Sequence, residues 1–344
     1  METVGVIGAG SFGTAIANML AENRKVLVYT RNDKLGNAIA NGERFNGWVL
    51  HPNITATQSL QTLAETCYII FPIVPSSNFR QMLRDLSPFL RPDHIMIHGT
   101  KGLDVILPEG KTLQDMEKLQ RRQIKTMSEV ILEESVVRRV GCISGPNLAK
   151  EILAGHPSAT VVASRFDEVK KEGIAALRSS RFRVHDNYDL LGIELAGVLK
   201  NIMAVASGIV SGLGYGENTR GMLIARGMAE IAKIGTALGA NPRAFLGVAG
   251  IGDLVATCNS PFSRNYTVGI RLAEGEKLSD ILASMTEVAE GVKTIQIAKK
   301  LADNYKIPVP ITQALYRALF EDLEVKKGIR LLMEYPFTED VEFI

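Results

Sequence analysis

Short apolar runs alternate with helical patterns along the first half of the chain. Four such runs occupy residues 3–7, 26–30, 68–73 and 94–98. Helical periodicity follows the first run at 14–22 and precedes the fourth at 81–90. This alternation predicts βαβ units and a parallel sheet. Further elements are predicted as strands at 141–144, 159–164 and 182–185 and as a charged amphipathic helix at 112–134.

The pattern changes near Asn187, after which only helical periodicity remains. We therefore expect an α/β domain over residues 1–188 and an all-helical domain over residues 189–344, with the boundary between 186 and 192. The helices of the second domain are predicted at 190–210, 221–238, 266–274, 278–285, 294–304 and 311–320.

The stretch from Leu195 to Leu213 is apolar for nearly the length of a membrane span. It is, however, rich in Ala and Gly, it carries Lys200 near its start, and it lacks aromatic or basic flanks. We interpret it as a buried helix of a soluble core and expect no stable membrane insertion.

Composition narrows the class of protein further. The 344 residues carry 39 basic and 37 acidic side chains, a net charge of +2 that gives no reason to expect nucleic-acid binding. Cys67, Cys142 and Cys258 are far apart and lack metal-ligand spacing, so we predict no metal site. Sparse cysteines and the absence of a signal-peptide pattern favour a cytoplasmic protein.

A glycine-rich loop, Gly8-Ala9-Gly10-Ser11-Phe12-Gly13, joins the first predicted strand to the first predicted helix. In that context Gly8 permits a tight turn, Gly10 lets a diphosphate approach the backbone, and Gly13 lets the helix pack against the strand. The helix N-terminus then attracts the diphosphate. The loop predicts a Rossmann-type doubly wound domain that binds a dinucleotide.

The end of the second strand carries the residues that choose between cofactors. Arg31 lies where a 2′-phosphate would be accommodated, which favours NADP, whereas Asp33 keeps NAD possible. A solvated strand end is the alternative interpretation of Arg31.

Lys200 is the only charge between Leu195 and Gly216. Lysine is rarely buried without a partner, and desolvation disfavours its charged form, which brings it into range for proton transfer. Lys200 is thus a candidate general acid/base. A structural lysine that reaches solvent, or that pairs with a buried acid such as Glu194, is the alternative.

Other polar residues stand at predicted turns. Asp253 lies in the apolar turn Gly250-Ile251-Gly252-Asp253-Leu254. Ser263 is a predicted N-cap, followed by Arg264 and Asn265 in the first helical turn, which is a natural anion site or else a capped helix with a solvated arginine. Lys101 and the segment Gly145-Pro146-Asn147 follow strands at the sheet edge where such folds bind ligands.

Taken in order, these blocks resemble the NAD(P)-dependent glycerol-3-phosphate dehydrogenases over nearly the whole chain. Besides the loop at 8–13 and the segments around Lys101, Asp253 and Ser263, the resemblance rests on Val74-Pro75-Ser76, Ser144-Gly145-Pro146, Glu194–Asn201 and Gly216-Glu217-Asn218-Thr219-Arg220.

The resemblance implies reversible reduction of dihydroxyacetone phosphate to sn-glycerol 3-phosphate with NADP or NAD, for glycerophospholipid synthesis, by a cytoplasmic homodimer. It makes Lys200 the proton donor in reduction. It carries substrate contacts onto Lys101, Gly145, Asn147, Lys200, Asp253, Ser263, Arg264 and Asn265. It carries cofactor contacts onto Ser11, Phe12, Arg31, Lys101, Ala149, Arg264, Val288 and Glu290, beside Gly8, Gly10 and Gly13.

Two positions depart from the family pattern, which has Trp at Phe12 and Ser or Thr at Asn147. The Phe12 ring still offers an apolar face, and the Asn147 amide can still donate a hydrogen bond. A related β-hydroxyacid dehydrogenase is the alternative enzyme, although the turn at Ser263 suits a phosphate better than a carboxylate. A redox sensor that binds NAD(P)H is the non-enzymatic alternative.

Overall fold

A computed structural model describes residues 2–31, 33–285 and 287–336. The chain divides into two compact units, which are described separately: the first is Met1–Asp104 with Thr126–Leu190, and the second is Val105–Lys125 with Leu191–Ile344. The chain therefore enters the second unit twice. The sequence analysis had assigned residues 105–125 to the first domain, whereas they cluster with the helices of the second unit.

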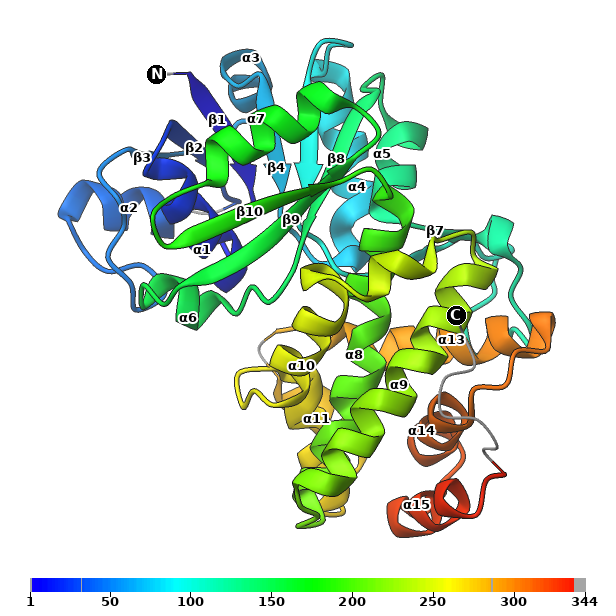
Figure 1. The fold of residues 1–344 in the computed structure, drawn as a ribbon. Helices are drawn as coiled ribbons and strands as arrows, with labels where there is room; N and C mark the ends of the chain where they lie inside the picture. Colours follow the sequence, from blue (N-terminus) through cyan, green and yellow to red (C-terminus); the bar gives the residue numbers. More distant parts are fainter. Residues whose placement is uncertain (1, 32, 286, 337–344) are drawn as a thin grey trace. The chain divides into compact units, whose positions relative to one another are not determined.

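The first unit is built on an eight-stranded sheet in the order β10-β9-β8-β5-β4-β1-β2-β3 (Figure 1). The order reverses between β1 and β4, because the chain first builds outward through β2 and β3 and then returns to β4. The strands are β1 (Thr3–Ile7), β2 (Lys25–Tyr29), β3 (Ile54–Thr57), β4 (Ile69–Pro72), β5 (Ile95–His98), β8 (Arg139–Ser144), β9 (Ser158–Ser164) and β10 (Phe182–Asn187).

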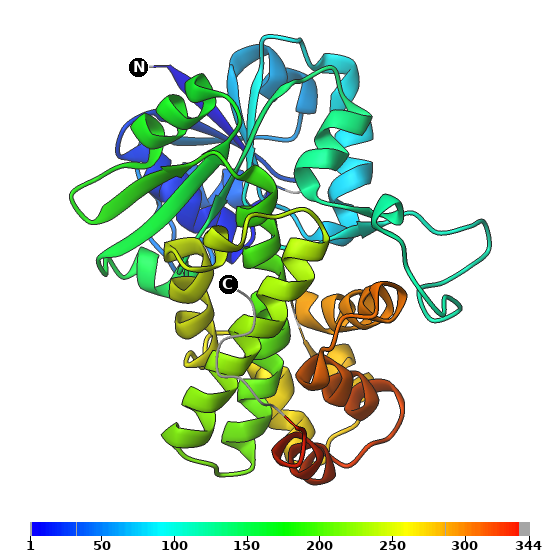
Figure 2. The same cartoon turned by 45° about the vertical axis from the view of Figure 1, so that its right-hand side comes forward.

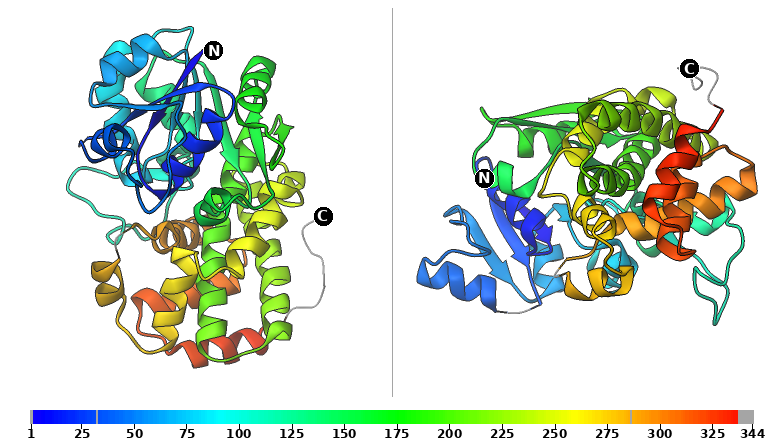
Figure 3. Two further views of the ribbon diagram at one scale, coloured as in Figure 1. Left: turned by 90° about the vertical axis from the view of Figure 1, so that its left-hand side faces the viewer. Right: turned by 90° about the horizontal axis from the view of Figure 1, so that it is seen from below.

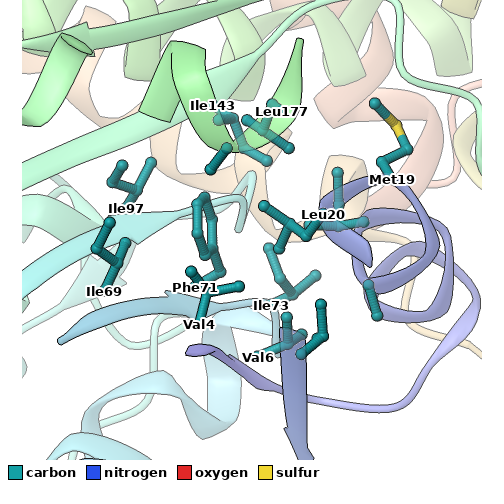
Figure 4. Packing of buried hydrophobic residues seen from close by; sticks show 14 of the residues in the cluster. Val4, Val6, Met19, Leu20, Ile69, Phe71, Ile73, Ile97, Ile143 and Leu177 are labelled. Atoms are coloured by element: carbon teal, nitrogen blue, oxygen red, sulfur yellow. The ribbon is translucent and has the colours of Figure 1, made fainter. Parts of the chain in front are cut away.

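Helices cover both faces of this sheet, and the side chains that alternate along its strands enter a separate hydrophobic core on each face. On one face Val4, Val6 and Phe71 pack against the helices α1 (Ser11–Ala21) and α7 (Asp167–Leu177). Figure 4 shows Leu20 of α1 and Leu177 of α7 in this core. On the other face Ile70 and Met96 pack against α3, α4 and α5. Burial on both faces explains why the central strands are almost purely apolar. The helices are α1 (Ser11–Ala21), α2 (Lys34–Asn41), α3 (Leu60–Thr66), α4 (Ser76–Leu86), α5 (Met127–Glu134), α6 (Ala149–Leu153) and α7 (Asp167–Leu177).

The doubly wound fold class is confirmed, with one difference at the edge of the sheet. β8 and β9 pair antiparallel, and β10 pairs parallel to β9. The connection from β8 to β9 holds only the short helix α6 and turns at Gly145 and Gly155, where φ is +155° and +81°. The five-residue helix rises only about 7 Å, which is too short to run back along a strand of about 20 Å, so the chain returns in the opposite direction. The sequence analysis also missed β3.

The predicted helix at 112–134 is wrong over its first half. Only α5 is α-helical there; residues 112–120 form an irregular segment, followed by a short turn, η2 (Arg121–Gln123). The backbone groups of this segment bind elsewhere in the second unit: the Leu119 N–H donates to the Lys300 carbonyl (3.2 Å), and the Lys300 ammonium donates to the Met116 carbonyl. Tertiary hydrogen bonds thus replace those that a helix would make within itself. Figure 2 shows the segment as a long loop.

The second unit is mostly helical, and its other helices pack around the 23-residue helix α8 (Leu190–Gly212; Figure 3). The most apolar window of α8 is fully buried. The helices that follow α8 are α9 (Glu217–Ala237), α10 (Asp253–Cys258), α11 (Arg264–Ala273), α12 (Leu278–Ser284), α13 (Glu290–Tyr305), α14 (Pro310–Phe320) and α15 (Val325–Met333). The sequence analysis predicted all of them to within a few residues except α10 and α15, which it missed.

A buried carboxylate joins α9 to the start of α14. Glu230 accepts hydrogen bonds from the Ile311 N–H (2.6 Å), the Thr312 N–H (3.0 Å) and the Thr312 hydroxyl (2.9 Å). These groups stand at the helix N-terminus, where an anion is favoured. Burial nevertheless dominates and raises the pKa of the Glu230 carboxyl to about 7, against the opposing effect of those three hydrogen bonds.

A raised pKa makes the folded state bind the Glu230 proton more tightly than the unfolded chain does. The contribution of Glu230 to the free energy of unfolding is fully present below the unfolded pKa of about 4.5. It is lost as pH rises through the folded pKa of about 7, and the free energy of unfolding changes by about 3 kcal/mol. We expect wild type to lose unfolding free energy between pH 5 and 8 relative to Glu230→Gln in urea titrations. Glu217→Gln, an exposed carboxylate on the same helix, is the control. Parallel pH profiles for wild type and Glu230→Gln would contradict this role.

Candidate active site

The turn after β1 has the shape that a dinucleotide diphosphate requires. Gly8 has φ of +116°, and a Cβ there would collide with the Ile73 carbonyl. A Cβ at Gly13 would collide with the Gly8 carbonyl, whereas one at Gly10 would meet nothing within 4 Å. Gly10 therefore faces open space at the N-terminus of α1, beside the point where the strand order reverses. Backbone amides at a helix N-terminus fit a diphosphate in that position.

The residues around this turn lie at the same edge of the sheet. Ser11 is the first residue of α1, and the half-buried Phe12 has its ring beside Gly99, since a Cβ at Gly99 would lie 3.1 Å from Phe12 Cε1. Arg31 lies exposed just after β2. Asp33 is also exposed, and its carboxylate accepts a hydrogen bond from Gln58. Arg31 is thus placed where it can meet an anion from solution.

The ends of β5 and β8 bring a second group together, because these two strands are parallel neighbours. Lys101 Nζ donates to the Gly145 carbonyl at 2.9 Å. Ala149 begins α6, three residues beyond Pro146. Lys101, Gly145, Asn147 and Ala149 therefore all lie at or just beyond the carboxyl ends of adjacent strands, where open α/β sheets bind ligands.

The hydrogen bonds of Asn147 fix which way its amide faces. Thr160 Oγ1 donates its proton to the Ser144 carbonyl (3.1 Å), so it must accept from Asn147 Nδ2 (2.8 Å). Asn147 Oδ1 is buried and has no hydrogen-bond partner within the described part of the chain. The Oδ1 acceptor can therefore receive a hydrogen bond from a ligand hydroxyl, and the second N–H of Nδ2 keeps the donor that the sequence analysis expected.

In the helical unit Lys200 is buried on α8 and pairs with an acid from α10. Its side chain is 7% exposed and that of Asp253 1% exposed, and the ammonium donates to Asp253 Oδ1. Thr257 Oγ1, one turn further along α10, lies 2.5 Å from the ammonium and 3.3 Å from Asp253 Oδ1. Lys200 thus does not reach bulk solvent. A buried ammonium with a fixed counter-charge can hold and release a proton at a defined point.

The predicted cap at Ser263 is confirmed. Ser263 Oγ accepts from the Tyr266 N–H (3.3 Å), and Arg264 and Asn265 are the first two residues of α11. Arg264 is partly exposed and pairs with Glu287 (2.6 Å). Asn265 is buried, and its Oδ1 accepts from the Gly291 N–H (2.9 Å). The start of α11 is therefore tied to the start of α13, where Val288 is exposed and Glu290 opens the helix.

Close backbone contacts hold both helix starts against α8. A Cβ at Gly208 would collide with the Tyr266 carbonyl on α11, and one at Gly269 with the Val205 carbonyl on α8. A Cβ at Gly291 would lie 2.8 Å from the Asn201 carbonyl, directly after Lys200, and 2.7 Å from Asn265 Oδ1. The absence of side chains at these glycines therefore sets the spacing between Lys200's helix and the turn at Ser263.

The predicted site residues thus form two groups, one in each unit. Gly8, Gly10, Ser11, Phe12, Gly13, Arg31, Lys101, Gly145, Asn147 and Ala149 belong to the first unit. Lys200, Asp253, Ser263, Arg264, Asn265, Val288 and Glu290 belong to the second. Sequence reasoning missed Thr257, Glu287 and Gly291. Thr257 could have been found from its four-residue spacing to Asp253, whereas the other two have no local signal.

The cysteines take no part in this chemistry. All three are buried and free of disulfides. Burial raises the pKa of the Cys67 and Cys258 thiols to about 12, and for Cys258 the nearby Lys200 opposes the shift only in part. Neither thiol is therefore ionised near neutral pH, in keeping with their interpretation as small buried apolar residues.

Comparison with known proteins shows to which family the chain belongs. Residues 3–170 match the family model of the NAD-dependent glycerol-3-phosphate dehydrogenase N-terminus, and residues 189–330 match that of the C-terminus. The chain belongs to this dehydrogenase family. It is 39% identical to a glycerol-3-phosphate dehydrogenase [NAD(P)+] of Pseudomonas aeruginosa, over 100% of this chain and 97% of the relative.

Other relatives agree with this membership. A glycerol-3-phosphate dehydrogenase [NAD(P)+] of Macrococcus caseolyticus is 38% identical over 99% of this chain and 100% of its own. A crystal structure of the Coxiella burnetii glycerol-3-phosphate dehydrogenase has a TM-score of 0.84 at 32% identity, covering 97% of this chain and 99% of that one. A Ralstonia eutropha ketopantoate reductase, with a TM-score of 0.57 at 14% identity, shares the fold alone.

We expect Gly291→Ala to impair this dehydrogenase although Gly291 bears no chemistry. The added methyl would press on the Asn201 carbonyl and on Asn265 Oδ1, and the backbone atom cannot move aside. A shift of about 1 Å in a site can cost about 100-fold, so we expect at least a tenfold loss of kcat/KM for the phosphorylated substrate in steady-state assays.

Gly221→Ala, on the exposed side of α9 and outside the site, is the control for general damage by a glycine change, because a Cβ there meets no atom within 4 Å and its backbone has no positive φ. Thermal unfolding of both variants separates lost fold from lost geometry. Full activity of Gly291→Ala would show that the contact between α8, α11 and α13 does not set the site.

Proposed function

We propose that the chain reversibly reduces dihydroxyacetone phosphate to sn-glycerol 3-phosphate with NADH or NADPH. Its relatives carry the name of this activity, glycerol-3-phosphate dehydrogenase [NAD(P)+]. The observation that carries the proposal is the buried Lys200–Asp253 pair on a helix whose neighbours begin with an anion-suited turn. The nicotinamide supplies the hydride when the cofactor is bound. The glycine turn at 8–13 is suited to its diphosphate, with Ser11 and Phe12 beside it.

Each residue of the helical unit has a distinct part in the proposed reaction. Lys200 polarises the substrate carbonyl and donates the proton to the oxygen that becomes the hydroxyl. Asp253 stabilises the ammonium, and Thr257 fixes its direction. Ser263, Arg264 and Asn265 bind the phosphate at the N-terminus of α11, with the charge of Arg264 providing the main attraction.

Residues of the first unit complete the proposed contacts. Lys101 supplies a second cation, held in place by the Gly145 carbonyl. Asn147 Oδ1 accepts from a substrate hydroxyl, and Ala149 contacts the cofactor. Val288 and Glu290 of the second unit are further proposed cofactor contacts. We further propose a cytoplasmic homodimer that supplies glycerophospholipid synthesis. It is not inserted in a membrane, since the most apolar window of α8 is buried.

Lys200→Met should lower kcat by about 100- to 10,000-fold, the usual contribution of a general acid, while NAD(P)H binding changes less than about twofold. Stopped-flow turnover and cofactor fluorescence measure the two effects. The single change leaves Asp253 as an uncompensated buried charge, which can unfold the unit. Lys200→Met combined with Asp253→Asn removes both charges, so it should refold without regaining turnover. A loss below tenfold in the folded double variant would exclude Lys200 as the acid.

Arg31→Asp should shift cofactor preference toward NADH, because a carboxylate repels the 2′-phosphate of NADPH and accepts from the ribose hydroxyl of NADH. We expect the ratio of kcat/KM for NADPH over NADH to fall at least tenfold. Arg165→Asp, an exposed arginine of the same unit, makes the same change in net charge away from the site. An unchanged ratio would leave Arg31 as a solvated strand end.

A further inference from the structure

Arg264 already has an anion bound to it from within the chain. Its Nη2 lies 2.6 Å from Glu287 Oε2, and its Nη1 donates to the Val288 carbonyl at 3.5 Å. Arg264 opens α11, whereas Glu287 belongs to the segment just before α13. The two side chains are 41% and 38% exposed, so an ion from solution can reach the pair.

A carboxylate and a phosphate bind a guanidinium through the same fork of N–H groups. Arg264 is the residue to which the proposed function assigns the substrate phosphate, and the family resemblance also implies that it contacts the cofactor. Glu287 thus lies on the donors that an incoming phosphate needs. Binding of both anions at full strength is excluded, because they would share one cation and repel each other.

We propose that Glu287 is an internal competitor for phosphate at Arg264 and thereby sets the affinity of this dehydrogenase for phosphorylated ligands. The inference rests on the proposed function, which makes Arg264 the phosphate-binding residue. A phosphate monoester displaces the Glu287 carboxylate from the guanidinium because it carries nearly two charges and more acceptor oxygens. An exposed ion pair is weak, so the competition changes affinity without closing the site.

The turn at Ser263 has anchors besides Glu287. Asn265 is held by the Gly291 N–H through a buried bond, and Ser263 caps α11 through Tyr266. Removing the charge of Glu287 therefore frees the Arg264 guanidinium while α11 and α13 keep their anchors. A residue that positioned Arg264 for binding would have the opposite effect when neutralised, so the sign of the change decides between the two roles.

Glu287→Gln tests the competition with an isosteric neutral side chain. Inorganic phosphate binding is measured by calorimetry on the full chain, and KM for dihydroxyacetone phosphate by steady-state kinetics. We expect the phosphate dissociation constant and KM both to fall about twofold to fivefold, the range of an exposed pair, with kcat within about twofold. The gain should shrink as NaCl is raised, since exposed charges are screened.

Glu276→Gln is the matched control. Glu276 lies 2.5 Å from Arg271, which is on α11 as Arg264 is, and the Glu276 side chain is 38% exposed, as that of Glu287 is. Glu276→Gln also makes the same change in net charge as Glu287→Gln. Unchanged or weaker phosphate binding in Glu287→Gln, equal gains in both variants, or no measurable phosphate binding in any of them would each overturn the proposal.

Two further readouts show which phosphate competes with Glu287 and separate the two hypotheses. Cofactor fluorescence gives dissociation constants for NADPH and NADH without turnover. If inorganic phosphate and NADPH bind more tightly in Glu287→Gln while NADH binding and KM for dihydroxyacetone phosphate stay the same, the competing group is the 2′-phosphate of the cofactor. Equal gains in inorganic phosphate binding and in KM, with no gain for NADPH over NADH, indicate the substrate phosphate. Tighter phosphate binding without any turnover of dihydroxyacetone phosphate would refute the proposed function and support the competition. Turnover without a change in phosphate or cofactor affinity would refute only the competition.

Discussion

The buried ion pair between Lys200 and Asp253 constrains how α8 and α10 pack in the helical unit. Lys200 is buried on a mostly apolar helix, so its charge requires a partner inside the unit. Asp253 meets that need from α10, which follows a π-helical turn at Val248–Gly252. Such turns occur often at functional sites. The position of α10 is therefore fixed by charge as well as by packing.

The same helix also serves as the reference for the other polar groups of the unit. Contacts at Gly208 and Gly269 bring α8 and α11 together without side chains between them, and Gly291 does the same for α13 beside Asn201. Arg264 and Asn265 therefore start from a backbone that is held close to Lys200's own helix. Rigid placement of this kind limits the entropy that substrate binding has to overcome.

In the sheet unit, strand direction decides which groups can reach a ligand. The parallel pairing of β5 with β8 places Lys101 and Gly145 side by side. The antiparallel return of β9 then places Thr160 where it orients the Asn147 amide and leaves its oxygen without a partner among the described residues. The Asn147 oxygen is thus oriented as an acceptor that a ligand hydroxyl can reach.

Local sequence was sufficient for the features that depend on neighbours along the chain. The apolar runs determined the central strands because burial on both faces demands them, the glycine spacing at 8–13 determined the turn, and Ser263 determined where α11 starts. The isolation of Lys200 in an apolar helix also showed that it needed a partner. Local sequence failed at 112–120, where hydrogen bonds to Lys300 replaced a helix, and at β9, whose direction depends on the fold.

Only the tertiary structure decided which residues meet across long separations. Asp253 and Thr257 lie more than fifty positions from Lys200. Glu287, just before α13, reaches Arg264, and Gly291, in the first turn of α13, reaches Asn265. No periodicity or motif encodes such pairs, because each depends on how helices cross rather than on neighbouring residues. The sequence by itself indicated the candidate side chains, and the packing of helices determined what each of them contacts within its own unit.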